Sequence, residues 1–436
     1  MKKQLITLGM AFLVTISTSV TAQNLNEIYQ LALQNDAELL IAESSYLSSL
    51  EAVPLARSGN RPQVFLNANG SLRESENSDS GHNSNQTIGY GISLTQSLYN
   101  TDTSANINTA EADSAAELAR LEATRQNLIL RTAEIYFSIL AAQDSVDFAY
   151  AERTAIARQL EQAQKRFEVG LIAITGVHEA QAAFDIAEAD VILAENQLET
   201  AHQSLLVITG LNQSAQLSRL GDSLDLNLPE PIGSVAWVEL AMENNRDLIA
   251  ARENLNAARS ERQRSGSNRN PTVDLTATYS DNDVNDDLIG DSRQGDITVG
   301  VELKMPLFVG GRLNAEQAQA EANYQSAQNS VLLQSRLASQ RVRTAYLNVV
   351  SGISQVNALK QALDSTVVAL EATQAGFEVG TRTSVDVLVS LRETYRAQRD
   401  YASARYDYLI NTLRLKEAAG ILAEKDLTEI NRWLKG

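Results

Sequence analysis

The chain of 436 residues contains no cysteine and only three histidines. The absence of cysteine excludes disulfides, thiolate metal sites and a lipid-modified N-terminal cysteine. His82, His178 and His202 are scattered along the chain, and none is paired with acidic residues at metal-ligand spacing. The sequence also lacks a glycine-rich loop followed by lysine that could hold a phosphate. We therefore expect neither a catalytic site nor a cofactor.

Long apolar runs are missing beyond the N-terminus. Two lysines precede a mostly apolar stretch over 6–16, and small residues follow at 20–22. This pattern predicts a secretory signal peptide over 1–22. The alternative, an uncleaved membrane anchor, is disfavoured because a bilayer span needs ~20 apolar residues. No later segment approaches that length, so we expect no transmembrane helix in the mature chain.

Acidic residues outnumber basic ones by 54 to 36, which gives a net charge of −18. A nucleic-acid-binding protein needs a basic face, so nucleic acid is not expected as a partner. An acidic balance suits a water-filled passage for cations. A well-solvated surface explains the same balance.

The sequence contains an internal duplication. Phe167-Glu168-Val169-Gly170 recurs as Phe377-Glu378-Val379-Gly380, at an offset of 210 residues. Other pairs keep this register within one residue: Pro62 with Pro271, Gly91 with Gly300, Tyr136 with Tyr346, and Gly210 with Gly420. A repeat with almost no insertions means that one structural unit is used twice. We expect a first structural repeat over 23–228 and a second over 229–436.

Each repeat contains a long stretch with few helix breakers. Proline is absent from 63–228 and 307–436, and Ala, Leu, Glu, Gln and Arg, which favour helix, are abundant. Apolar residues recur at spacings of three, four and seven, which is typical of a coiled-coil seam.

These patterns predict two helical hairpins, 103–210 and 314–420, which turn at Gly170 and Gly380. Both hairpins end at a glycine, as helices often do. One helix opens each repeat, near 24–53 and 235–266, and a short C-terminal extension follows residue 420.

Between the opening helix and the long helix of each repeat, the hydrophobic period changes to two. This alternation predicts two strands near 62–98 and two near 271–306, each of ~10 residues. Such strands suit a barrel wall in an outer membrane or a half-buried soluble sheet. No other segment is available to cover the apolar face, which favours lipid. We expect the acidic segment 281–287 to form a solvated loop, although it faintly resembles a calcium-binding loop.

Four strands cannot close a barrel by themselves. An open sheet edge in lipid leaves backbone groups unpaired at several kcal/mol each. The smallest closed forms are a dimer with about 8 strands and a trimer with about 12, and a wide lumen favours the larger number.

Three further stretches complete the pattern: Gly376–Leu388, Ala402–Asn411 and Pro306–Gly311. Together with the Phe-Glu-Val-Gly turns, they resemble the TolC family of outer-membrane efflux proteins, over the whole mature chain. The resemblance implies an α+β membrane protein, a homotrimer with a single 12-stranded β-barrel and four strands per chain. A long α-helical coiled-coil tunnel would continue the barrel through the periplasm of a Gram-negative bacterium.

The resemblance also implies function and partners. The channel would export drugs, dyes, detergents or proteins across the outer membrane. It would receive them from an inner-membrane transporter of the RND, ABC or MFS type, through a periplasmic adaptor, or membrane fusion, protein. The alternative is a non-transport structural coiled-coil protein of the periplasm. The duplicated strands next to the helices count against this alternative.

A gate at the hairpin tips follows from the same resemblance. Asp386 matches the first of two aspartates that form carboxylate rings under threefold symmetry, and Val389 stands at the second position. Such a ring attracts cations and can bind one that plugs the pore. Without the resemblance, Asp386 is interpreted as a carboxylate that the helix dipole favours.

Four residues match the positions of a lock that holds the family's tip shut. Arg382 matches the lock arginine and Thr175 its threonine partner. Gly176 replaces the usual aspartate and Phe377 the usual tyrosine, and neither can form the side-chain bond. We expect the closed state to be held less tightly, or by packing of Phe377.

Overall fold

The structure is a computed structural model that describes residues 23–77, 81–210, 217–221, 224–286 and 290–435. The expected signal peptide, 1–22, lies outside the described residues. The helices of the first half are α1 (Leu25–Asn35), α2 (Ala37–Ser58), α3 (Thr101–Glu168) and α4 (Ile174–Thr209). Those of the second half are α5 (Ser234–Asn244), α6 (Arg246–Ser267), α7 (Arg312–Glu378), α8 (Ser384–Ala418) and α9 (Glu424–Asn431). The strands are β1 (Gln63–Asn77), β2 (Gly81–Tyr99), β3 (Arg219–Leu220), β4 (Thr272–Asp286), β5 (Ser292–Lys304) and β6 (Leu434–Lys435).

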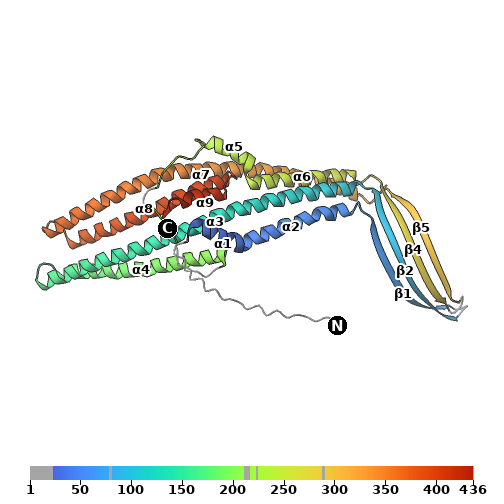
Figure 1. Ribbon diagram of the computed structural model, residues 1–436, viewed down its shortest axis with the longest axis horizontal. Helices are drawn as coiled ribbons and strands as arrows, with labels where there is room; N and C mark the ends of the chain where they lie inside the picture. Colours follow the sequence, from blue (N-terminus) through green and yellow to red (C-terminus); the bar gives the residue numbers. More distant parts are fainter. Residues whose placement is uncertain (1–22, 78–80, 211–216, 222–223, 287–289, 436) are drawn as a thin grey trace, which may run out of the picture.

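The molecule is elongated, with a sheet at one end and the turns of two helical hairpins at the other (Figure 1). The two longest helices, α3 and α7, contain 68 and 67 residues. At 1.5 Å per residue, each reaches ~100 Å. Among the described residues, no helix is both long and apolar enough to cross a membrane.

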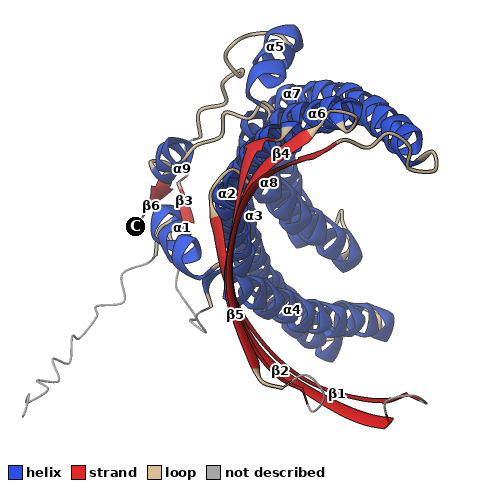
Figure 2. Ribbon diagram, turned by 90° about the vertical axis from the view of Figure 1, so that its right-hand side faces the viewer, coloured by secondary structure: helices blue, strands red, loops and turns tan. Residues whose placement is uncertain are grey.

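The sheet is antiparallel, in the order β1-β2-β4-β5, and it is strongly curved (Figure 2). Its register aligns Leu66 with Ile92, Ile92 with Tyr279, and Tyr279 with Ile297, so apolar side chains share one face. This face is bare in the single chain, since Leu66 is 75% and Ile297 74% exposed. The prediction of four strands per chain next to long helical hairpins is confirmed.

The strands extend further than the sequence indicated. The segment 281–286, predicted as part of a loop, is the end of β4 and pairs with both neighbouring strands. Asp281 accepts two hydrogen bonds from Arg293, at 3.0 and 2.9 Å, and one from Tyr90 at 3.1 Å. Cross-strand partners therefore support a polar stretch that lacks apolar alternation.

The single opening helix predicted for each repeat is wrong, because each is broken in two. Asp36 and Asn245 adopt extended backbone angles between the paired helices. The side chain of Asp36 accepts a hydrogen bond from Leu39 N at 2.8 Å, and that of Asn245 accepts one from Leu248 N at 3.0 Å. Both residues thus end one helix and cap the next, a use of Asp and Asn that favours a break.

A hydrophobic core lies midway along the helices, where both repeats meet; we call this region the waist. Phe137 of α3 stacks on Tyr406 of α8, with ring centroids 5.7 Å apart. The buried Tyr136 donates a hydrogen bond to Ser218 O at 2.8 Å. The short sheet β3-β6, which the sequence did not predict, joins the linker to the C-terminal end here. The waist holds the two hairpins side by side.

Gly420 is expected to be indispensable at the waist. Its φ is +75°, and a Cβ there would overlap the carbonyl of Asn244 and lie 2.7 Å from Asn245 N. Gly420→Ala should lower the unfolding free energy by about 3 kcal/mol, through backbone strain and displacement of the α5–α6 break. Chemical denaturation followed by circular dichroism measures this change.

The matched control is Gly266→Ala, since Gly266 is helical with open space at its Cβ position. This control should stabilise the protein by ~0.5 kcal/mol or more. Equal unfolding midpoints for the two variants would contradict the expected role of Gly420.

Candidate gate at the hairpin tips

Both hairpins turn by the same hydrogen-bond pattern. Gly170 N donates to Phe167 O at 2.8 Å, and Leu171 N donates to Arg166 O at 2.8 Å. In the second repeat, Gly380 and Thr381 bond in the same way to Phe377 and Gly376. The glycines have φ of +74° and +82°, which glycine adopts without a steric penalty. The repeated tetrapeptide therefore places two equivalent turns at one end of the molecule.

Asp386 lies in the first turn of α8 and forms a capping box with Thr383, the N-cap residue of that helix. Its carboxylate accepts hydrogen bonds from the backbone N and the hydroxyl of Thr383, both at 2.9 Å. The backbone bond from Thr383, its hydroxyl and the charge of Arg382 together hold the pKa of Asp386 below its usual range. The carboxylate therefore stays ionised at neutral pH and stabilises the helix start. Val389 lies one turn further along α8 and is 54% exposed.

The predicted lock residues are close in sequence to the turns, but among the described residues no hydrogen bond or ring contact joins any two of them. Arg382 and Thr175 are both exposed, and no hydrogen bond between them is found among the described residues. The stem of Arg382 instead covers Gly376, where a Cβ would lie 2.8 Å from Arg382 Cγ. A pairing of Arg382 with Thr175 stays a prediction that a neighbouring copy would have to satisfy.

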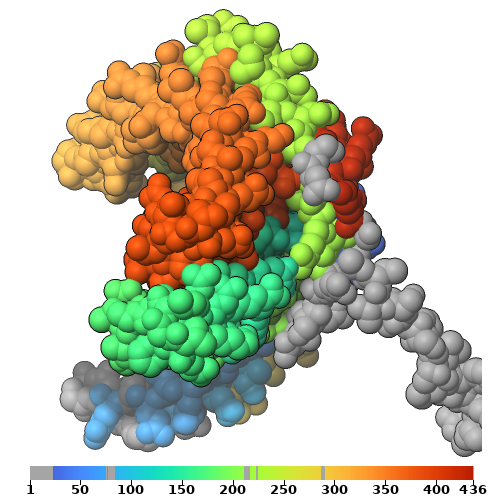
Figure 3. All heavy atoms as spheres, turned by 90° about the vertical axis from the view of Figure 1, so that its left-hand side faces the viewer, coloured from blue at the N-terminus to red at the C-terminus, as the bar shows by residue number. Residues whose placement is uncertain are grey.

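The first turns of α4 and α8 meet at Gly176. A Cβ placed on Gly176 would lie 3.7 Å from Ser384 Oγ and 3.5 Å from Ile172 Cδ1. Phe377 is buried, at 9% exposure, and the guanidinium of Arg166 lies over its ring at 4.1 Å. Figure 3, which views the tips end on, shows the α7–α8 hairpin (orange) resting on the α3–α4 hairpin (green).

From the waist towards the tips, polar contacts join α3 to α8. Arg414 bonds Glu134 at 2.9 Å, Tyr406 donates to Asp144 at 2.6 Å, and Arg399 pairs with Glu152 at 3.1 Å. The residue numbers rise along α3 as they fall along α8, as expected for antiparallel helices. The contacts therefore form a ladder that fixes the register of one hairpin against the other.

The carboxylates of the ladder are buried to different degrees. Burial raises the pKa of Asp144, although the hydrogen bond from Tyr406 opposes this shift. The side chain of Glu152 is only 5% exposed, and Arg399 is its ion-pair partner. Closer to the tips than this ion pair, apolar residues from both hairpins pack together, among them Ile156, Ala183 and Leu388.

Sequence analysis did not find Arg166, Glu152 or Arg399. One signal was available for Arg166: at the repeat offset of 210 its counterpart is Gly376, so the two turns differ there. The pairing of Glu152 with Arg399, 247 residues apart in sequence, has no comparable local signal.

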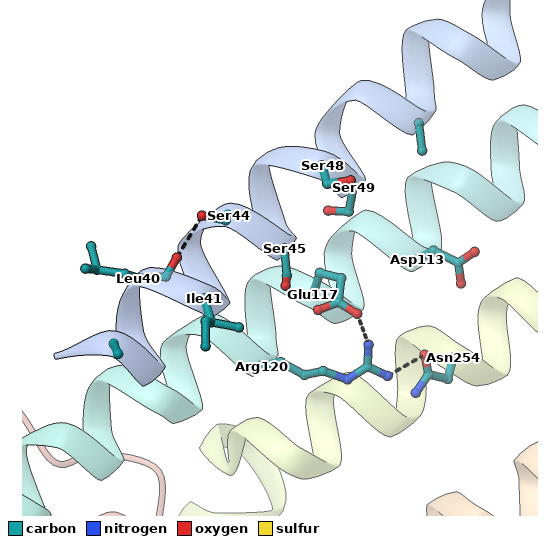
Figure 4. Close-up of a pocket in the computed structure, with 12 residues that line it drawn as sticks. Leu40, Ile41, Ser44, Ser45, Ser48, Ser49, Asp113, Glu117, Arg120 and Asn254 are labelled. Carbon is teal, nitrogen blue, oxygen red and sulfur yellow. Dashed lines mark hydrogen bonds and ion pairs between the residues drawn. The ribbon is translucent and has the colours of Figure 1, made fainter.

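A long groove lies far from the tips, along α2, α3 and α6 (Figure 4). Serines at 44, 45, 48 and 49 line one wall, and Arg120 bonds Glu117 and Asn254 on the other. The lining residues include no histidine and no pairing of a hydroxyl with a base, which a catalytic nucleophile requires.

Comparison with known proteins finds one matching family and several relatives that span nearly the whole chain. The family model described as outer membrane efflux protein matches residues 28–211 and 237–421, one match in each repeat. The outer membrane protein TolC of Vibrio cholerae is 39% identical over 438 residues, covering 100% of this chain and 99% of the relative. The alkaline protease secretion protein AprF of Pseudomonas aeruginosa is 26% identical, covering 96% and 88%.

Solved structures share the fold. The CmeC outer membrane channel of Campylobacter jejuni superposes with a TM-score of 0.81 at 16% identity, covering 100% of this chain and 98% of the other.

Removing one partner of the buried ion pair should destabilise the protein. Arg399→Gln leaves the Glu152 carboxylate buried without a counter-charge, so the unfolding free energy should fall by about 3 kcal/mol. The double variant Glu152→Gln/Arg399→Gln should recover part of this loss, because no charge then remains buried. Chemical denaturation of the purified protein measures both variants.

The control is Arg396→Gln, which breaks an exposed pair with Glu393 on the same helix. Its effect should stay within ~1 kcal/mol. A single variant at 399 no worse than this control would show that Glu152 is not held by the ion pair.

Proposed function

We propose, since this chain belongs to the outer membrane efflux protein family, that three copies assemble into one export duct gated at the hairpin tips. The chain is a subunit of an outer-membrane efflux channel. It lies in the outer membrane and reaches into the periplasm. The homotrimer and the gate are the parts that we propose.

One observation carries assembly into a ring: among the described residues, the sheet exposes its apolar face and leaves β1 and β5 as its edge strands. The number three follows from the family resemblance. In lipid, unpaired edge groups cost several kcal/mol each, so a neighbouring copy must pair with each edge. The helices lie side by side in the same order as the strands to which they are joined: α2 packs on α3, α3 on α6, and α6 on α7. Closing the strands in a ring therefore also closes the helices around a central passage.

The exported substrates are small molecules, proteins or both. The name of the relative AprF refers to secretion of a protease, and that of the matching family to efflux. The chain offers no nucleotide-binding motif, so energy must come from an inner-membrane transporter of the RND, ABC or MFS type. A periplasmic adaptor protein would connect that transporter to the hairpin tips.

At the gate, threefold symmetry turns Asp386 into a ring of three carboxylates, with a ring of Val389 one turn away. A ring of fixed negative charge at a constriction selects cations. The same carboxylate belongs to the capping box of α8, so its hydrogen bonds to Thr383 hold it in place at the start of the helix.

Single-channel recording from the purified, membrane-extracted oligomer in a planar bilayer tests the proposal. We expect steady events of low conductance that rise when the tip contacts are removed by substitution. A folded oligomer that never conducts would overturn the gated duct and favour a structural coiled-coil protein.

Cation block should depend on Asp386 and on pH. Asp386→Asn should weaken block by a trivalent cation on the order of a hundredfold, because three charges are lost at ~1 kcal/mol or more each. Block should persist on mild acidification, since the pKa of Asp386 is depressed, and should be lost only well below the ordinary aspartate pKa of about 3.9. The contribution of the ionised carboxylate to stability is lost in the same acidic window.

Asp407→Asn, an exposed aspartate further along α8, is the matched control and should leave block unchanged. Val389→Asp adds a second carboxylate ring and should strengthen block. If block in the Asp386→Asn channel equals that of the unaltered channel, the cation site lies elsewhere.

Gly176→Asp should tighten the closed state. At the repeat offset of 210, Gly176 corresponds to Asp386, and α4 lacks the side-chain cap that α8 has. An aspartate at 176 would favour the start of α4 by ~0.5 kcal/mol or more and place a carboxylate near Ser384. Conductance at rest should fall, whereas Gly176→Ala, which only improves helix propensity, should leave it nearly unchanged. Equal conductance in both variants would argue against a polar contact at this position.

A further inference from the structure

We infer that Arg166 clasps the two hairpins of one subunit together by holding its guanidinium against the ring of Phe377. This inference rests on the proposed gate and names a contact that holds it closed. The Cζ of Arg166 lies 4.1 Å from the ring centroid, well inside the range of a cation–π contact. Arg166 comes from the last turn of α3 and Phe377 from the last turn of α7. The contact therefore joins the two hairpins at their tips.

Burial supports the contact from both sides. Phe377 is 9% exposed, although it stands beside a solvent-facing turn. Arg166 is half-buried and forms no ion pair with any residue that the structure describes. A planar guanidinium stacks on an aromatic face with little loss of hydration, so the ring can serve as the partner of this charge.

The duplication provides an internal comparison. The counterpart of Phe377 in the first repeat is Phe167, which is 42% exposed and has no cation over its ring among the described residues. The counterpart of Arg166 is Gly376, which has no side chain to offer. The space at Gly376 is occupied by the stem of Arg382, so a larger residue there would have to displace it. The clasp therefore reaches from the first hairpin to the second, and the second hairpin has no equivalent contact to offer to a first hairpin.

This one-sidedness distinguishes two kinds of tip interface. Within a subunit, Arg166 reaches from the first hairpin to the second. Where the second hairpin of one subunit meets the first hairpin of the next, the same geometry would bring Gly376 to Phe167, and no clasp can form. Opening of the tip therefore has to break the clasp if the hairpins of one subunit separate, but not if neighbouring subunits separate.

The test is a double-mutant cycle read by single-channel recording. Arg166→Gln and Phe377→Leu should each raise the occupancy of the open level by roughly tenfold to a hundredfold, since three contacts each contribute ~2- to 5-fold. The double variant should open no more than either single variant, because both remove the same contact. Arg166→Lys keeps a positive charge and should retain part of the closure, which separates a charge–ring contact from simple packing.

Phe167→Leu is the matched control, as it makes the same change in the turn of the other repeat. It should leave the occupancy of the open level unchanged. Additive effects of the two single variants, or an equal effect of Phe167→Leu, would overturn the clasp while leaving the gated duct intact.

A second readout does not depend on conduction. Hydrogen exchange of the tip amides should accelerate in Arg166→Gln and Phe377→Leu, again without additivity, and not in Phe167→Leu. If the unaltered oligomer never conducts but exchange shows this coupling, the gate fails and the contact stands. Unchanged exchange in all three variants would overturn the contact itself.

Discussion

The open edges of the four-stranded sheet are the constraint on which the rest of the structure depends. A strand edge exposed to hydrocarbon leaves N–H and C=O groups without partners, so the sheet can exist in lipid only as part of a closed ring. The curvature of the sheet and its exposed apolar face both fit this requirement. Since each strand of this sheet is joined to a helix at one end, the helices follow the strand order and form a curved layer in turn.

The waist holds the two hairpins of this layer side by side, and the proposed gate depends on that arrangement. The breaks at Asp36 and Asn245 dock against the ends of α4 and α8, where Gly210 and Gly420 lie next to Asn35 and Asn244. These contacts repeat in both halves of the chain, so they follow the duplication. The polar ladder between α3 and α8 does not repeat, because it joins the two halves. The contacts at the helix breaks therefore follow the symmetry of the two repeats. The contacts between the hairpins do not follow it.

Sequence patterns predicted the scaffold well. The spacing of apolar residues and the scarcity of proline and glycine marked α3 and α7, and alternation of period two marked the strands. The break at Asp36 was missed because an aspartate within a helical pattern does not by itself show that its side chain will cap the next turn. The outer ends of β4 and β5 were missed because pairing of Asp281 with Arg293 and Tyr90 replaces apolar alternation there.

The site was predictable only in part. Gly170 and Gly380 were visible in the repeated tetrapeptide, and the place of Asp386 followed from the family resemblance. Its capping bond to Thr383 agrees with the interpretation from helix chemistry alone. The ring of Phe377 was recognised as a departure from the family, whereas its partner Arg166 depends on how two hairpins cross, which no local pattern encodes.

The length of α3 has a mechanical consequence. From Phe137 in the waist to Glu168 at the tip, the helix runs without interruption for roughly 45 Å. A lever of this length turns a tilt of ~6° at the waist into a displacement of roughly 5 Å at the turn. Such a tilt breaks no backbone hydrogen bond along the shaft. A repacking of the aromatic side chains around Phe137 that tilts α3 by this angle would therefore move the distant end by the width of a side chain.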